Sequence, residues 1–481
     1  MFPTNRPRFS GYFPFLLFWA MLLYLPLSAK VYRVGASFHF SDPYTLSVSG
    51  ALKDGDTVLI APGIYSGQAA TALWSASHLL IRGEDGMAEM VADGHHNGGK
   101  AIWVVSGDHI TVENIAFYNC TVPDRNGAGI RSEGKGLTIK DCRFIGNENG
   151  VLSNSPYAGH ILIERSEFGY NGYSDGYSHN VYINHVDTFT FRFNYSHHAR
   201  TGHHVKSRAT SNFILCNRIS DEAEGNSSRL IDLPNGGFSV VTGNVLMQGP
   251  MAENNNLVGY GMEGLTNPAG DFYFVNNTLV NKRESSCRFL QLAETSGATA
   301  VINNIFAGKG IIVEGTPSIL VANLASEDPE FFRFNDEPAN DYRLTAESPA
   351  ADAGIDPGMV HGVPLLPRWV YMHPADSAKR ENSGLPDIGA YGYQAPGSVQ
   401  ASVVRGFFLF PNPAYTFDMT RVVTPVPCKK FLLVGSGGGE HRVDCGPQGF
   451  RLPSAILPGL YCVKLIGEKG VTISKMVVLS R

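Results

Sequence analysis

The chain has 481 residues, a formal net charge of -5 and a pI near 6.3. That length favours one large domain with a smaller one, and a content of 43% apolar and only 17% charged residues excludes a disordered chain. The lack of a basic surplus argues against a nucleic-acid binder, because such proteins neutralise phosphates with lysine and arginine.

The first 29 residues are typical of an export signal. Arg6 and Arg8 precede an almost wholly apolar run over 12–27, and two small residues follow it. An uncleaved membrane anchor is the alternative, but the run contains two prolines and is short for a span of about 20 residues. We therefore expect a cleaved signal peptide over 1–29, with membrane contact only through this peptide or through surface attachment.

Short apolar runs then recur about every 25 residues, which indicates a solenoid. The runs are too short and too strictly alternating for helices, and few hairpin signals separate them. An Asn in the shared turn tolerates the left-handed backbone of a coil corner, and stacked Asn side chains can hydrogen-bond along the coils. The repeated windows are VENIAF (112–117), IKDCRF (139–144), IERSEF (163–168), FRFNYS (191–196), ILCNRI (214–219), VVTGNV (240–245), FVNNTL (274–279) and VINNIF (301–306).

These repeats resemble the right-handed parallel β-helix proteins of the pectate-lyase-like superfamily, over residues 30–395. The stretch 50–67 is similar to the N-terminal opening of such helices, and 348–357 with 380–393 is similar to the segment that ends many of them. The resemblance implies an all-β fold, a right-handed parallel β-helix. A solenoid also needs caps that shield the core at its ends.

A linker is predicted over 396–405, and the chain changes character over 406–481. The motifs FPNPA (410–414), GLYCVKL (459–465) and KMVVLS (475–480) together resemble the C-terminal sorting domain of proteins exported by the type IX secretion system. The resemblance implies a small β-sandwich, the type IX machinery as a partner, and a secreted or outer cell-surface location. An ordinary accessory β-domain is the alternative.

Seven cysteines cannot all pair with one another. Cys428, Cys445 and Cys462 are evenly spaced, but none forms a CxxC pair, so we expect neither a zinc nor a redox site. Buried thiols with at most one disulfide are the simpler interpretation.

The stretch 179–236 concentrates polar and cationic side chains in a sparsely charged chain. If the apolar residues of three short strands face inward, alternation directs Tyr182, Lys206 and Asp232 outward. These residues are 24 and 26 positions apart, about one coil each, so we expect them to stack about 5 Å apart on one face. The flanking outward positions are predicted to be Asn180 and His204 on one side, and Asn184 and Arg208 on the other. His179, Arg229 and Asn235 complete the predicted substrate-binding set.

Such a patch suits an acidic polysaccharide. Its β-elimination needs a cation for the uronate carboxylate, a base for the alpha proton and an acid for the leaving oxygen. Lys206 is the expected base, because His204 and Arg208 would favour its neutral form by like-charge repulsion. Tyr182 is the expected acid, and Arg208 or a bound cation would neutralise the carboxylate. Asp232 would orient Lys206 or bind Ca²⁺, although no cluster has the spacing of a structural metal site.

The stretch VKSRATSNFILCNRI (205–219) resembles the catalytic coil of alginate lyases and chondroitinase-B-like lyases. In those enzymes a Lys followed by Ser, with an Asn a few residues on, supplies the base. The resemblance assigns these places to Lys206, Ser207 and Asn212.

The chain departs from those lyases at two points. Their acid Arg at the end of the next coil's strand corresponds to Pro234, with Arg229 five residues earlier. Their acidic residues before the Lys are replaced by His203 and His204.

We therefore expect a secreted or surface carbohydrate-active protein that acts on an acidic polysaccharide by β-elimination. The alternative, favoured by Pro234, is a non-catalytic glycan-binding or adhesin-like β-helix, in which a Lys–Asp pair is an ordinary surface salt bridge worth under about 1 kcal/mol. A hydrolase of the polygalacturonase kind is a weaker hypothesis, because it needs converging carboxylates. Asp221, Glu222 and Glu224 cluster in sequence but are predicted to face solvent.

Overall fold

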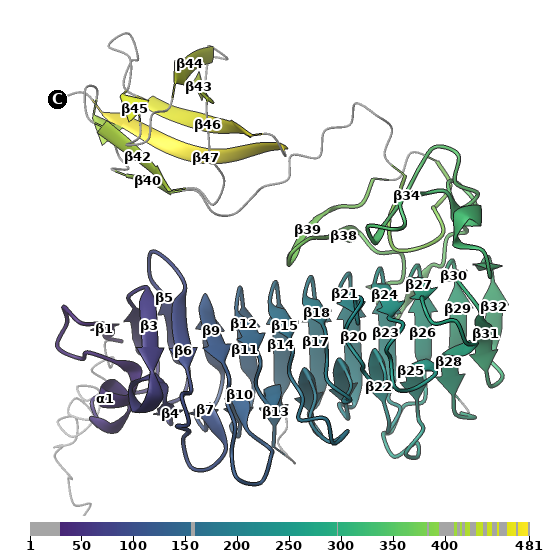
Figure 1. Ribbon diagram of the computed structural model, residues 1–481, viewed down its shortest axis with the longest axis horizontal. Coiled ribbons are helices and arrows are strands. Elements are labelled where there is room, and N and C mark those ends of the chain that lie inside the picture. The colour runs from purple at the N-terminus through teal and green to yellow at the C-terminus, as the bar shows by residue number, and fades with distance from the viewer. Residues whose placement is uncertain are drawn as a thin grey trace, which may run out of the picture.

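The computed structural model describes residues 29–154, 159–295, 297–381 and 384–393, together with the backbone of strands between 408 and 479. Residues 31–326 form a right-handed parallel β-helix in which three sheets run along the whole length (Figure 1). The predicted fold class is therefore confirmed. The predicted linker and all but the last residue of the predicted signal peptide lie outside the described residues.

Sheet A contains twelve parallel strands. In spatial order they are β1 (Val31–Val34), β2 (Thr57–Ile60), β5 (Leu80–Gly83), β8 (Ile110–Glu113), β11 (Leu137–Lys140), β14 (His160–Glu164), β17 (Thr188–Arg192), β20 (Ser211–Leu215), β23 (Phe238–Thr242), β26 (Phe272–Val275), β29 (Thr299–Ile302) and β32 (Ile319–Val321).

Sheet B contains eleven strands, each of which follows a strand of sheet A after a tight turn. They are β3 (Gly63–Ser66), β6 (Ala88–Val91), β9 (Ile115–Tyr118), β12 (Arg143–Ile145), β15 (Glu167–Gly169), β18 (Tyr195–His197), β21 (Arg218–Ser220), β24 (Val245–Gln248), β27 (Thr278–Asn281), β30 (Ile305–Ala307) and β33 (Leu324–Ser326).

Sheet C contains ten strands and carries the candidate site. They are β4 (Ala72–Trp74), β7 (Ala101–Val105), β10 (Ala128–Ser132), β13 (Asn149–Ser153), β16 (Val181–Ile183), β19 (Val205–Ser207), β22 (Ile231–Leu233), β25 (Asn256–Tyr260), β28 (Cys287–Leu292) and β31 (Gly310–Glu314).

The core is a column of inward side chains that repeats from coil to coil. Phe117, Phe144 and Phe168 stack on one another with ring centroids 5.0 and 4.8 Å apart, and all three are fully buried. Burial of each ring stabilises the fold by about 1.5–3 kcal/mol. In the following coils this position is taken by Ser196, Ile219 and Leu246. The apolar residues of successive coils form one core cluster that holds the sheets together.

In the turn between sheets A and B, the left-handed backbone and the stacked Asn side chain belong to two consecutive residues, whereas the sequence analysis assigned both to a single Asn. The first turn residue adopts the left-handed conformation, and it is Phe193 in one coil and Cys216 in the next. The second is the stacked Asn: the Asn194 amide donates to Asn217 Oδ1 at 3.1 Å, and Asn217 donates to Asn244 Oδ1 at 2.9 Å. The same contacts continue through Asn277, Asn304 and Asn323. The predicted Asn ladder is confirmed, and an Asn also takes the left-handed position before the ladder residue at Asn276 and Asn303, and in the same turn at Asn114.

The two ends of the helix differ. At the N-terminal end, α1 (Pro43–Val48) covers the first coils with the buried side chain of Leu46, and the Asp42 carboxylate caps the helix by accepting from Thr45 N–H at 2.8 Å. At the other end, Leu320 and its neighbours on β32 remain exposed. Among the described residues, the segments expected to cap the C-terminal end of the helix do not cover it, so that prediction is wrong about where they lie.

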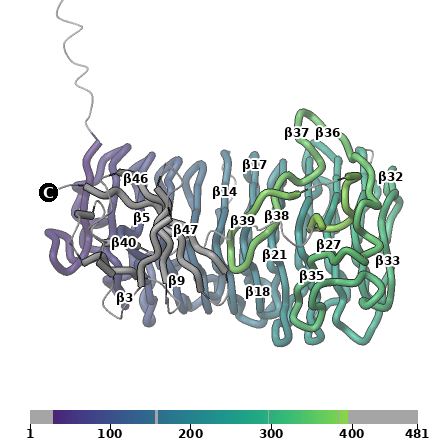
Figure 2. Tube along the Cα trace, turned by 90° about the horizontal axis from the view of Figure 1, so that it is seen from above, coloured from purple at the N-terminus to yellow at the C-terminus, as the bar shows by residue number. Residues whose placement is uncertain are grey.

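Residues 327–381 and 384–393 instead lie along the sides of the helix, from the last coils back to the coil of β17 and β18, as Figure 2 shows from above. Phe332, Tyr342 and Ile388 pack on outward residues of sheet B, and Leu365 packs on sheet A. The elements are η2 (Pro329–Phe332), β34 (Phe334–Asp336), β35 (Asp341–Leu344), β36 (Met359–Val360), β37 (Val363–Pro364), β38 (Trp369–Met372) and β39 (Asp376–Lys379); η1 (Gly67–Ala70) lies near the start of the chain.

The C-terminal strands form a three-stranded and a five-stranded sheet. The small β-sandwich that the sequence predicts here, and its trafficking role, stay predictions. The strands are β40 (Phe408–Phe410), β42 (Met419–Val423) and β45 (Phe450–Arg451), then β41 (Ala414–Tyr415), β47 (Gly470–Leu479), β46 (Gly459–Gly467), β43 (Lys430–Gly435) and β44 (Glu440–Asp444).

Four cysteines lie in the β-helix, and all are buried free thiols: Cys120, Cys142, Cys216 and Cys287. Burial raises the pKa of each of these thiols to about 12, so they serve as small core residues. None of the helices in the described part of the chain is long and apolar enough to span a bilayer.

Candidate functional site on sheet C

One outward position repeats in register along all ten strands of sheet C. The predicted order is confirmed at its centre, where Tyr182 pairs with Lys206, and Lys206 pairs with Asp232. The complete row is Leu73, Val104, Arg131, Leu152, Tyr182, Lys206, Asp232, Gly259, Gln291 and Glu314. The apolar neighbours on the three central strands face the core, as strand alternation requires.

Lys206 lies between two carboxylates. Its Nζ is 3.4 Å from Asp232 Oδ2 and donates to Glu263 Oε1 at 2.8 Å. Only 11% of the lysine side chain is exposed. This environment differs from the expected one, in which two cations would flank the amine.

Arg208 follows β19 and joins three neighbours on the same face. Its Nε donates to the Tyr182 hydroxyl at 3.0 Å, and its two terminal nitrogens donate to Asn235 Oδ1 and Glu263 Oε2, each at 2.5 Å. The guanidinium therefore fixes the phenol of the predicted acid and the carboxylate that covers the predicted base.

Asp232 is the fixed anion of the site. Its side chain is only 1% exposed, and Oδ1 accepts from the Arg229 guanidinium at 2.9 Å. Burial raises the pKa of Asp232 above its ordinary range, although Arg229 and Lys206 act in the opposite direction. The Asp232 carboxylate cannot move away from the site, because Asp232 lies on a strand and its oxygens are bound by two cations.

Arg229 reaches the row although it precedes the strand. Its side chain crosses the position of Gly259 and donates to Gln291 Oε1 at 3.2 Å. A Cβ on Gly259 would lie 3.2 Å from Arg229 Nε and 3.1 Å from Asp232 Oδ1. The missing side chain of Gly259 is therefore what makes room for the guanidinium.

His179 and His203 stack beside the row, with ring centroids 4.9 Å apart and nearly parallel planes. The His203 backbone N–H donates to His179 Nδ1 at 2.9 Å, and His203 Nε2 lies 3.5 Å from Asp232 Oδ2. Burial, reinforced by nearby cations, lowers the pKa of both imidazoles well below the usual histidine range. Both rings are therefore neutral near pH 7 and form a wall of the site.

The outward placement predicted for Asn180 and His204 is wrong. Both side chains are fully buried inside the coil, where His204 Nε2 contacts Asp221 Oδ1 at 3.0 Å and Nδ1 contacts Ser196 Oγ at 3.0 Å. Asn180 completes this interior network through the same Ser196 hydroxyl. The Ser–His–Asp arrangement has no exposed atom for a substrate to reach, so it supports the turn rather than chemistry.

Three further predicted positions also have structural partners. Ser207 donates to Asn212 at 2.6 Å, and both are fully buried, so this pair holds the turn that carries Arg208. Asn184 is half-buried and accepts from the His185 backbone N–H at 2.9 Å.

The carboxylates that the sequence analysis assigned to solvent are mostly enclosed. Asp221 is fully buried, and Glu222 is held by Arg218 and Tyr195 on sheet B. Only Glu224 is exposed as predicted. His197 also lies on sheet B, beside Glu167, and is thus on a different face from Lys206.

Glu263 is the site residue that the sequence analysis missed. It lies in the loop between β25 and β26, 57 residues after Lys206. Partial burial pushes its pKa upward, but hydrogen bonds from Lys206 and Arg208 outweigh that effect and hold the pKa of Glu263 below the usual glutamate range. The length of this loop was the feature of the sequence that could have indicated an additional residue at the site.

The residues of the site do not fit the Ca²⁺ that the sequence left open. Calcium takes six to eight oxygen ligands, whereas both carboxylates here are occupied by Lys206, Arg208 and Arg229. Over the described part of the chain, His, Cys, Asp and Glu form no group of three or more that is arranged to hold a metal.

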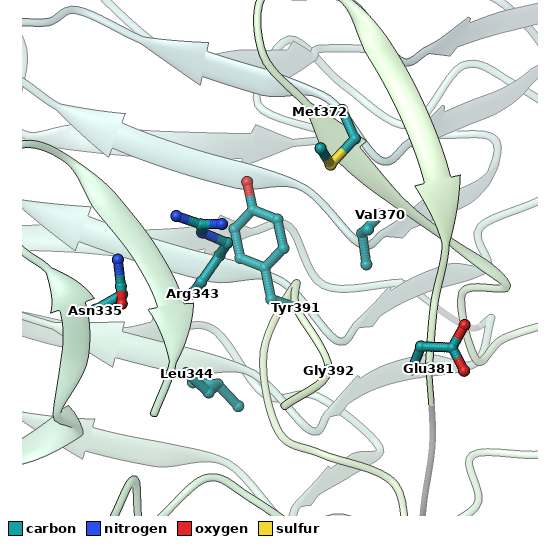
Figure 3. Close-up of a pocket in the computed structure, with 8 residues that line it drawn as sticks. All are labelled: Asn335, Arg343, Leu344, Val370, Met372, Glu381, Tyr391 and Gly392. Carbon is teal, nitrogen blue, oxygen red and sulfur yellow. The ribbon is translucent and has the colours of Figure 1, made fainter. Parts of the chain in front are cut away.

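A separate polar cavity of about 160 Å³ lies among the segments over 335–392 that flank the helix (Figure 3). None of the predicted site residues lines it. Its walls are Asn335, Arg343, Leu344, Val370, Met372, Glu381, Tyr391 and Gly392.

Comparison with known proteins supports the fold. The crystal structure of the pectate lyase Pel9A is similar to this one, with a TM-score of 0.51 and 14% sequence identity, over 76% of this chain and 96% of the other. Likeness at this identity shows a shared β-helix architecture. No family model and no curated protein matches the sequence.

Proposed function

We propose that this chain is a carbohydrate-active protein that cleaves an acidic polysaccharide by β-elimination on the outward face of sheet C. The observation that carries the proposal is the cluster of Lys206, Arg208 and Tyr182 in one register on that face. The name of the similar structure, a pectate lyase, points to the same class of substrate.

The three residues suit the three parts of the reaction. The uronate carboxylate binds the Arg208 guanidinium, and Lys206 Nζ, acting as the free amine, takes the alpha proton. The electrons of that C–H bond form the new double bond as the glycosidic bond breaks. Tyr182 donates its proton to the leaving oxygen. The Arg208 Nε–H already occupies a lone pair of the phenol oxygen, so the phenol proton remains available for the substrate.

A non-catalytic glycan-binding protein is the second candidate. The observation that favours it is the pairing of Lys206 with both Asp232 and Glu263, which suits a permanent cation better than a base. In that case the same cations would bind acidic glycan without cleaving it.

One assay separates the candidates. The purified protein is incubated with a panel of uronate polymers, and both ultraviolet absorbance of unsaturated product and new reducing ends are measured. Elimination predicts both signals, and Lys206→Ala should reduce them by about 10²–10⁴-fold while circular dichroism shows that the variant is still folded. Binding without either signal supports the second candidate. Reducing ends without absorbance would instead indicate hydrolysis and would exclude elimination. Full activity of Lys206→Ala would exclude Lys206 as the base.

Export is part of the proposal and rests on sequence motifs alone. A signal peptide over 1–29 and sorting motifs over 406–481 suit a protein that meets polymers outside the cell. Truncation after residue 395 should then leave the protein in the periplasm. Normal secretion of the truncated chain would contradict the sorting role.

A further inference from the structure

Glu263 pairs with both residues that meet the substrate in the proposed reaction, the base Lys206 and the carboxylate-binding Arg208. One carboxylate oxygen accepts from Lys206 Nζ at 2.8 Å, and the other accepts from an Arg208 terminal nitrogen at 2.5 Å. A uronate carboxylate bound to the Arg208 guanidinium would occupy the place that the Glu263 carboxylate takes there. The chain thus places its own carboxylate where the substrate's carboxylate is expected.

The two carboxylates beside Lys206 differ in their freedom to leave. Asp232 lies on a strand with 1% of its side chain exposed, whereas Glu263 lies on a loop with 45% of its side chain exposed. Solvent screens an ion pair to such an exposed group and weakens it. Glu263 is therefore the carboxylate that another anion can displace, and Asp232 stays to hold the lysine.

The loop backbone is anchored on both sides of this side chain. Glu263 N–H donates to the Pro234 carbonyl at 2.9 Å, and the Asn267 amide donates to the carbonyls of Ala209 and Gly236, each at 3.0 Å. Displacement thus requires only a rotation of the Glu263 side chain towards solvent.

We propose that Glu263 is an internal occupant of the substrate-carboxylate site, which a uronate carboxylate displaces when the polymer binds. In naming a uronate, this inference rests on the proposed function. The exchange keeps Lys206 and Arg208 paired when no polymer is bound. It also selects for acidic sugars, since a neutral sugar offers nothing to replace the glutamate. Glu263 is a specificity-determining residue and takes no proton in the reaction.

The test is the affinity of Glu263→Gln and Glu263→Ala for polygalacturonate and alginate, measured by calorimetry against the wild type. Glu253→Gln is the matched control, because Glu253 is exposed and its replacement changes the net charge equally. Both Glu263 variants should bind at least one polymer about fivefold more tightly or better, while Glu253→Gln binds like the wild type. Dextran, a neutral polymer, should bind to none of them.

Equal or weaker binding by both Glu263 variants overturns the inference, as does the absence of binding to either polymer by any of the proteins. Its failure is distinguishable from that of the proposed function. If Glu263→Gln binds more tightly but the wild type forms no unsaturated product, the elimination proposal fails and this inference stands. If the wild type cleaves the polymer and Glu263→Gln gains no affinity, this inference fails and the elimination proposal stands.

Discussion

Lys206 on β19 and Asp232 on β22 occupy neighbouring positions of sheet C, with 3.4 Å between Nζ and Oδ2. The parallel register aligns the two residues although 26 positions separate them in the chain. Because Asp232 is buried and also bound to Arg229, it fixes where the lysine amine lies. The positions of the charged residues at the centre of the row therefore depend on the buried carboxylate of Asp232.

Replacing Asp232 with Asn should lower the urea midpoint and cost about 3 kcal/mol of unfolding free energy, because loss of one partner leaves buried charge uncompensated. Asp124→Asn is the control, since Asp124 is exposed, and a surface change of this kind stays within about 0.5 kcal/mol. Equal midpoints for the two variants would show that Asp232 does not hold the site.

Stability should fall as the pH drops below about 6.5. The pKa values of His179 and His203 lie below their ordinary range in the folded protein, so the unfolded chain binds more protons there and is stabilised relative to the folded protein as pH falls. Each histidine contributes up to about 1.4 kcal/mol per pH unit. Urea unfolding between about pH 7 and about pH 5 measures the effect. The double variant His179→Gln/His203→Gln should show a flatter dependence, and an unchanged slope would contradict the account. His160, His198 and His373 shift in the same direction, so some slope remains.

Gly259→Ala should destabilise the fold by about 1–3 kcal/mol through overpacking, because its Cβ meets Arg229 and Asp232 at 3.2 and 3.1 Å. The cost should be smaller when Arg229 is already replaced by Ala. A double-mutant cycle from chemical unfolding measures this coupling. Strict additivity of the two changes would mean that Arg229 does not lie across Gly259.

The row could be predicted from the sequence because coil length and strand alternation fix it. Spacings of 24 and 26 residues place Tyr182, Lys206 and Asp232 one coil apart, and the alternation holds within each three-residue strand. The alternation fails one residue before the strand begins. Asn180 and Val181 both face inward, because the chain is still turning before β16 begins. The same reason explains His204.

Glu263 could not be predicted, because loops carry no periodicity. The long connection before β26 indicates that something extra covers the face at this coil, but neither its path nor its direction follows from composition. The charge balance of the site therefore differs from the expected one, with carboxylates rather than cations around Lys206.

The central claim, that an acidic polymer binds the row on sheet C, is tested most directly by hydroxyl-radical footprinting with and without the polymer that responds most strongly in the panel. Tyr182 is half-buried on the row, whereas Trp369 is exposed on β38 away from it. The account predicts that the polymer reduces oxidation of Tyr182 several-fold and leaves Trp369 unchanged. Unchanged oxidation of Tyr182 at a saturating polymer concentration would contradict it.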